Sequence, residues 1–227
     1  MNRKQITKYL NYDLPYILVI LICCIVAYWP VSFFVYSLKN DALNYFLPVR
    51  FQVSEAINNG FWPFWSPYFN LGYPLHGDMQ SGVWNPIVQI ISLFGAYTLK
   101  TLQFETVLYV FLSGVGMFYL IKHFKIDKKI CLLISVSYML CGYNSDSAQF
   151  LNWISSAAFL PFVILFFYRS LSEHSWKLCM ICGLFFYIYF VTAYPADFII
   201  LFYLLLSLFM WTLLHQNNTC QFKSFCL

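Results

Sequence analysis

The sequence predicts an all-α polytopic membrane protein whose chain crosses the bilayer about six times. Hydrophobic residues make up 61% of the chain and charged residues only 10%, with a mean hydropathy of +0.66. A soluble domain carries roughly a quarter charged residues. Aromatic residues reach 22%, as expected where amphipathic rings gather at the membrane interfaces. We therefore expect a single transmembrane domain over residues 1–227.

Six apolar runs approach or exceed the length of about 18 residues that indicates a membrane span. The first run is longer than the apolar part of a signal peptide and no small-residue cleavage site follows it, so it is expected to stay as a span. The third run is short and ends at Gly142, or at Ser147 if its polar end is included. The predicted spans cover residues 14–36, 102–121, 130–142, 152–168, 178–193 and 198–214.

Lysine and arginine predict the orientation of these spans. With the N-terminus in the cytoplasm, ten of the 13 basic residues lie on the cytoplasmic side. The other side holds only Lys39, Arg50 and Lys100. This bias follows the positive-inside rule, and the basic residues form no stripe of the kind that binds nucleic acid. We expect a multi-pass protein that contacts lipid and not nucleic acid.

The longest segment between predicted spans, residues 37–101, is interpreted as one extracytoplasmic loop. Its apolar stretch 87–99 is too short to span, and counting it as a span would invert every later loop against the charge bias, so we expect a helix along the outer interface. Residues 41–58 predict a second helix, with Pro48 expected to bend its early part. A long loop with its own helices is usually functional.

The eight cysteines fall mostly inside apolar runs. Cys179 and Cys182 have the spacing of a redox or zinc motif, but no second pair of ligands accompanies them. We interpret them as small hydrophobic side chains.

An ordered series of short motifs carries a family resemblance. The loop contains Asp41 and Pro48, then GFWPFWSPY at 60–68, GYP at 72–74 and DMQSGVWNP at 78–86. Later pieces are LCG at 140–142, QFLNW at 149–153, Pro161 and AYPAD at 193–197. This series resembles the N-terminal region of the YfhO-like bacterial membrane proteins, which are similar to the GT-C glycosyltransferases.

The resemblance implies an activity, partners and a location. Enzymes of this type take a sugar from a polyprenyl-phosphate carrier and transfer it to an envelope glycopolymer, such as a teichoic acid, on the outer face of the bacterial cytoplasmic membrane. An acidic residue in the first outer loop typically serves as their catalytic carboxylate. Family members are much longer than this chain, so the resemblance predicts the N-terminal portion of such an enzyme. A transporter or lipid flippase and a non-catalytic fragment or partner subunit are the alternatives.

Asp41 and Asp78 are the predicted catalytic residues. Asp41 follows the first span closely, where a carboxylate can take a proton from an acceptor hydroxyl at the membrane surface; the alternative is a helix N-cap. Asp78, together with His76 and Gln80, could bind the acceptor or a divalent cation that bridges the carrier phosphate, although two ligands alone make a weak cation site. The alternative for Asp78 is a polar turn. We assign no metal ligands, and a divalent cation is the one cofactor left open.

Four further residues complete the predicted substrate site. Arg50 has the planar guanidinium that suits a phosphate; its alternative role is an ion pair with Glu55. Trp62, Trp65 and Tyr68 could stack on sugar rings or line a groove for the carrier lipid, but interfacial anchoring is the simpler account.

Two acids, Asp146 and Asp197, lie at the outer ends of predicted spans and could reach the same cavity. Acids at a membrane boundary are functional candidates by default. Because the polar residues gather at the outer end and the spans are mostly apolar, the sequence favours an outward-facing site over a transport pathway.

Overall fold

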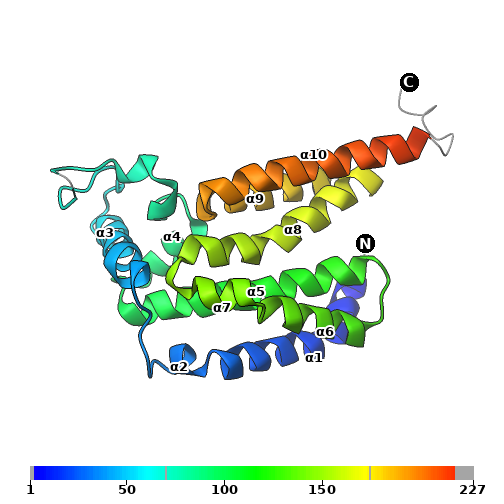
Figure 1. The fold of residues 1–227 in the computed structure, drawn as a ribbon, viewed down its shortest axis with the longest axis horizontal. Helices are drawn as coiled ribbons and strands as arrows, with labels where there is room; N and C mark the ends of the chain where they lie inside the picture. Colours follow the sequence, from blue (N-terminus) through cyan, green and yellow to red (C-terminus); the bar gives the residue numbers. More distant parts are fainter. Residues whose placement is uncertain (1–2, 70, 174, 218–227) are drawn as a thin grey trace.

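The computed structural model describes residues 3–69, 71–173 and 175–217 (Figure 1). Within these residues all regular structure is helical apart from one isolated bridge between Ser66 and Tyr73, which confirms the predicted all-α class. The longer helices are α1 (Arg3–Ala27), α3 (Leu47–Asn58), α5 (Leu99–His123), α6 (Lys128–Met139), α8 (Leu151–Glu173), α9 (Trp176–Thr192) and α10 (Pro195–Asn217). The short ones are α2 (Trp29–Ser32), η1 (Ala42–Phe46), η2 (Leu75–Gly77), η3 (Met79–Ser81), α4 (Pro86–Ser92), α7 (Gly142–Asp146) and η4 (Ser147–Gln149).

Three described helices are long and apolar enough to cross a membrane: Leu99–His123, Leu151–Glu173 and Pro195–Leu214. At 1.5 Å per residue the shortest of them measures about 30 Å, the thickness of the hydrocarbon core. The apolar part of α10 is only 11% buried inside the chain, against 61% for α8. A lipid environment accounts for so much exposed apolar surface, and the chain is a membrane protein.

The other predicted spans correspond to shorter helices. The apolar part of α1, Asp13–Ala27, stops before the Trp29-Pro30 step that begins α2, because proline cannot donate the backbone hydrogen bond of a continuous helix. α9 has 17 residues and α6 has 12, so α6 is only about 18 Å long. Crossing the membrane about six times therefore stays a prediction.

The long helices lie side by side, and α3 and α4 cover one end of the bundle (Figure 1). α5 is central and packs against α1, α6 and α8. A methyl group at Gly114 in α5 would come within 2.8 Å of Ile20 Cγ2 in α1. A small residue therefore allows these two helices to approach closely, as is common in membrane bundles.

The segment before α5 folds as a cap with its own core. The helix predicted at 41–58 is confirmed as the π-helical turn η1 followed by α3, with Pro48 in the first turn of α3. The helix predicted at 87–99 is shorter, since α4 ends at Ser92, and α5 already begins at Leu99 with Thr98 and Thr101 forming a capping box. The core of the cap includes residues from the N-terminal ends of α5 and α8. It consists of Leu38, Ala42, Phe46, Val49, Val53, Leu75, Val83, Val88, Tyr97, Leu102 and Leu151.

Candidate functional site

A cavity of about 540 Å³ lies between the cap and the N-terminal end of α8. Its volume falls within the range of roughly 300–1,000 Å³ that is typical of small-molecule sites. The cap and the later helices both contribute, and the lining residues are Asp41, Tyr45, Phe46, Tyr73, Asp78, Gln80, Phe150, Asn152, Trp153 and Tyr194. Three of the predicted site residues, Asp41, Asp78 and Gln80, therefore share one cavity.

Asp41 is exposed at this cavity and does not act as a helix cap. Its backbone is already helical, with φ −61° and ψ −28°, and its side chain makes no capping hydrogen bond. The residues on both sides of Asp41 are anchored. Ala42 is fully buried, and the amide of Asn40 donates to Gln149 Oε1 at 2.6 Å. The backbone of Asp41 is thus held in place, and its exposed carboxylate lines the cavity.

Asp78 has both carboxylate oxygens engaged. Oδ1 accepts from the backbone N–H of Gln80 at 2.9 Å, and Oδ2 accepts from the Tyr45 hydroxyl. Burial, together with the hydrogen bond to Asp78, raises the pKa of Tyr45 well above its ordinary value, so Tyr45 remains a neutral donor. The polar turn considered for Asp78 is therefore present, and the same carboxylate still lines the cavity.

Aromatic rings from later in the chain also line the cavity. Trp153 has its ring centroid 4.9 Å from Phe150 and 5.9 Å from Tyr194. The Asn152 amide next to it donates to Gln80 Oε1 at 3.2 Å, which ties the first turn of α8 to the cap. A cavity lined by both carboxylates and aromatic rings suits a polyhydroxylated ligand, because its hydroxyls bond to carboxylates and its C–H faces pack on the rings.

Arg50 is not among the residues that line this cavity, and its role at a phosphate stays a prediction. Its side chain is 5% exposed and its Nε lies 3.6 Å from Oε2 of Glu105, which is 0% exposed. The Arg50 Nη1 also donates to the carbonyl of Gln80 at 3.2 Å. The ion-pair partner is thus Glu105 in α5 and not Glu55, and the buried guanidinium connects the cap to the bundle.

The buried Glu105 carboxylate has further donors. The hydroxyls of Tyr97 and Tyr109 both donate to it, the latter at 2.9 Å. The Asn85 amide in turn donates to the Tyr109 hydroxyl at 2.7 Å. Both oxygens of the buried carboxylate are therefore hydrogen-bonded, which helps a buried ion pair to be tolerated, although Arg50 Nε has no hydrogen-bond partner among the described residues.

His76 and the predicted aromatic residues lie outside the cavity lining. His76 Nδ1 is 3.0 Å from the carbonyl oxygen of Phe64, and the ring packs on the Phe64 ring. Trp62, Trp65 and Tyr68 are exposed by 40%, 59% and 77%. The structure therefore does not bring these four residues to Asp41.

The acids at the helix ends and the cysteine pair are also outside this cavity. Asp197 accepts from the Tyr143 hydroxyl at 3.3 Å and lines a neighbouring, mostly apolar cavity of about 300 Å³. Asp146 is exposed at the end of α7. Cys179 and Cys182 are free thiols. Among the residues that the structure describes, no group of three or more His, Cys, Asp and Glu is arranged to hold a metal ion.

No family model, curated protein or solved structure matches this chain. The YfhO-like resemblance therefore stays a prediction, and the geometry of the cavity is the observation that bears on function.

Reasoning from the loop alone missed Tyr45, Asn152, Trp153 and Tyr194. Asn152 and Trp153 belong to the QFLNW motif, and Tyr194 belongs to AYPAD. Both motifs belong to the ordered series that carries the family resemblance. Their membership of that series is the sequence signal that could have placed Asn152, Trp153 and Tyr194 in the site.

Gly82 makes room for the Arg50 guanidinium. It has φ +80°, and a methyl group on it would lie 1.6 Å from Arg50 Nη1. Gly82→Ala is therefore expected to lower the free energy of unfolding by about 2–4 kcal/mol, from the left-handed backbone and from overpacking together. Thermal unfolding in detergent measures the loss.

Gly60→Ala is the matched control for this prediction. Gly60 has φ +77° but nothing within 4 Å of the added methyl group, so it carries only the backbone cost of about 1 kcal/mol. Equal losses for the two variants would show that the contact with Arg50 has no energetic weight.

Proposed function

We propose that the chain is a membrane glycosyltransferase, or the N-terminal portion of one. It would transfer a sugar from a polyprenyl-phosphate carrier to a glycopolymer acceptor of the bacterial envelope, on the outer face of the cytoplasmic membrane. The observation that supports this most strongly is that Asp41 and Asp78 line one cavity with Gln80 and aromatic rings.

In this proposal Asp41 is the general base. An acceptor hydroxyl would attack the anomeric carbon of the carrier-linked sugar while Asp41 takes the hydroxyl proton. The bond from that carbon to the carrier phosphate breaks, and the phosphate leaves with the electron pair, which inverts the sugar carbon. Asp78 is restrained by Tyr45 and Gln80 and would orient sugar hydroxyls, and Trp153 and Tyr194 would pack on the ring faces.

The charge of the residues that line the cavity indicates which cofactor the proposed reaction would need. The residues that line the cavity include two carboxylates and no lysine or arginine, so the site itself supplies no positive charge to the carrier phosphate. Asp41 and Asp78 would hold a divalent cation here, and the cation would supply the positive charge that the lining residues lack. Transfer that continues unchanged in the presence of a chelator would remove the cation from the proposal.

The proposal includes six crossings with the N-terminus in the cytoplasm. α9 is about 26 Å long and can cross a slightly thinned bilayer, and the bias of lysine and arginine favours this orientation. In a cysteine-free background, Asn59→Cys is expected to react with a membrane-impermeant thiol reagent in intact cells, and Lys125→Cys only after permeabilisation. The reverse pattern would place the cap in the cytoplasm and remove the outer-face site.

Reconstitution of the whole chain tests the activity directly. Vesicles containing the purified chain, a radiolabelled polyprenyl-phosphate sugar and the glycopolymer acceptor are expected to accumulate label in the polymer. Movement of the carrier across the bilayer without transfer would favour the flippase alternative. Label that neither moves nor transfers would show that this chain alone is not the enzyme.

A further inference from the structure

A second cavity, of about 440 Å³, lies at the end of the bundle opposite the candidate site. The candidate site is lined from the N-terminal end of α8, whereas this cavity is lined from the C-terminal parts of α5 and α8 and from α9. Along α8, Trp153 of the candidate site and Arg169 of this cavity are 16 residues, or about 24 Å, apart. The cavity therefore cannot belong to the chemistry proposed for Asp41.

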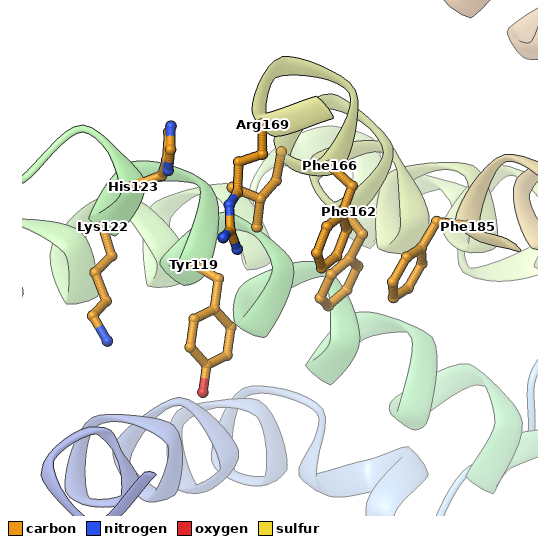
Figure 2. A pocket seen from close by; sticks show the side chains of 8 residues that line it. Tyr119, Lys122, His123, Phe162, Phe166, Arg169 and Phe185 are labelled. Carbon is orange, nitrogen blue, oxygen red and sulfur yellow. The ribbon is translucent and has the colours of Figure 1, made fainter. Parts of the chain in front are cut away.

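One side of this cavity is basic. Lys122 and His123 occupy the last turn of α5, and Arg169 faces them from α8. Figure 2 shows Lys122 and His123 toward one end of the cavity and Arg169 between them and the phenyl rings. The side chains of Lys122 and Arg169 are 27% and 33% exposed, so both are accessible from the cavity.

The other side is an aromatic stack. The Phe185 ring lies 4.9 Å from the Phe162 ring and 5.1 Å from the Phe166 ring, with interplanar angles of 6° and 8° (Figure 2). Phe162, Phe166 and Arg169 follow one another at intervals of four and three residues on one face of α8. An apolar ligand that lies along this face therefore ends at the guanidinium.

Two carboxylates face three basic side chains at this end of the bundle. Asp13 bonds to Lys122 and also to Lys128, at 2.8 Å, so one buried carboxylate serves two ammonium groups. Arg169 donates to Glu173, one turn further along α8, through Nε at 2.7 Å and Nη2 at 3.2 Å, which leaves Nη1 for a further acceptor. The cavity rim thus carries more positive than negative charge, which favours an anion.

We propose that this cavity binds one anionic phospholipid, with its phosphate between Lys122 and Arg169 and an acyl chain along the three phenyl rings. The amphipathic lining distinguishes a lipid from a free phosphate, which would leave the aromatic side unused. The surplus charge distinguishes an anionic lipid from a zwitterionic one. Basic pockets between transmembrane helices bind lipid headgroups for these reasons. The site depends on the chain lying in a membrane and not on any glycosyl transfer.

Native mass spectrometry of the whole chain in detergent tests the proposal. The chain is titrated separately with dioleoyl-phosphatidylglycerol and with dioleoyl-phosphatidylcholine. The first molecule of phosphatidylglycerol is expected to bind more tightly than the first molecule of phosphatidylcholine. Arg169→Gln is expected to weaken it about fivefold, the effect of one basic residue at a membrane surface. Lys129→Gln removes the same charge from an exposed residue that does not line the cavity and is expected to leave binding unchanged.

A second variant tests the apolar side. Phe185→Ala removes the ring that lies against both other rings and is expected to weaken phosphatidylglycerol binding while the preference over phosphatidylcholine remains. Equal binding of the two lipids, or equal weakening by Arg169→Gln and Lys129→Gln, would overturn the proposal. Complete displacement of the lipid by millimolar inorganic phosphate would reduce the site to one for a free anion.

Discussion

Asp41→Asn is expected to lower the rate of sugar transfer by about 10²–10⁴-fold, the usual contribution of a positioned general base. The amide has nearly the same shape as the carboxylate but cannot accept the acceptor's proton. Since Asp41 is exposed and makes no capping hydrogen bond, the change in the free energy of unfolding is expected to stay within about 0.5 kcal/mol. The initial transfer rate in vesicles and thermal unfolding in detergent measure the two quantities.

Asp146→Asn is the control for this loss. Asp146 is exposed and does not line the cavity. Its substitution removes the same charge as Asp41→Asn, so this variant should transfer sugar at the wild-type rate. A comparable loss in both variants would mean that surface charge, and not base catalysis, governs the rate. An Asp41→Asn enzyme with the wild-type rate would exclude Asp41 as the base.

Asp78→Asn provides a useful contrast. The asparagine side chain keeps an oxygen that can accept from Tyr45 or Gln80, so the restraint on this turn is partly retained. If Asp78 orients sugar hydroxyls, its variant should raise the KM for the carrier-linked sugar more than it lowers kcat, whereas Asp41→Asn should lower kcat.

Patterns within short stretches of the sequence predicted the parts of the fold and site that depend only on residues close together in the chain. The helix at 41–58 and the turn at Asp78 follow from apolar spacing and from residues with known turn preferences, and both are present. Apolar length predicted the three helices that can span a membrane. It could not predict that α1 breaks before Trp29, where the helix ends at a proline-containing turn.

Tertiary contacts determine the rest. Arg50 is the clearest case, because its nearest acid in the sequence is Glu55 whereas its partner in the fold is Glu105. Nothing in the spacing of the loop indicates that α5 supplies a buried carboxylate at that point. Trp153 and Tyr194 likewise reach the cavity only because α8 and the turn before α10 pack beside the cap.

Arg50→Met is expected to lower the free energy of unfolding by about 3–5 kcal/mol, the cost of leaving one member of a buried ion pair without its partner. Glu105 is 0% exposed, so its charge cannot be solvated in place. For a chain of this size the loss corresponds to a fall in Tm of about 6–20 °C. Thermal unfolding of the purified chain in one detergent measures it.

The double variant Arg50→Met/Glu105→Gln separates charge from packing. Glutamine removes the buried charge and keeps an oxygen that can accept from Tyr97 or Tyr109, so the double variant is expected to regain more than half of the lost stability. Recovery would show that compensation of Glu105 is the main role of Arg50. If the double variant is no more stable than Arg50→Met, the contact from Arg50 to the Gln80 carbonyl is the more important one. Gln80 lines the cavity, so Arg50 would then act chiefly by holding this part of the cap in place at the site.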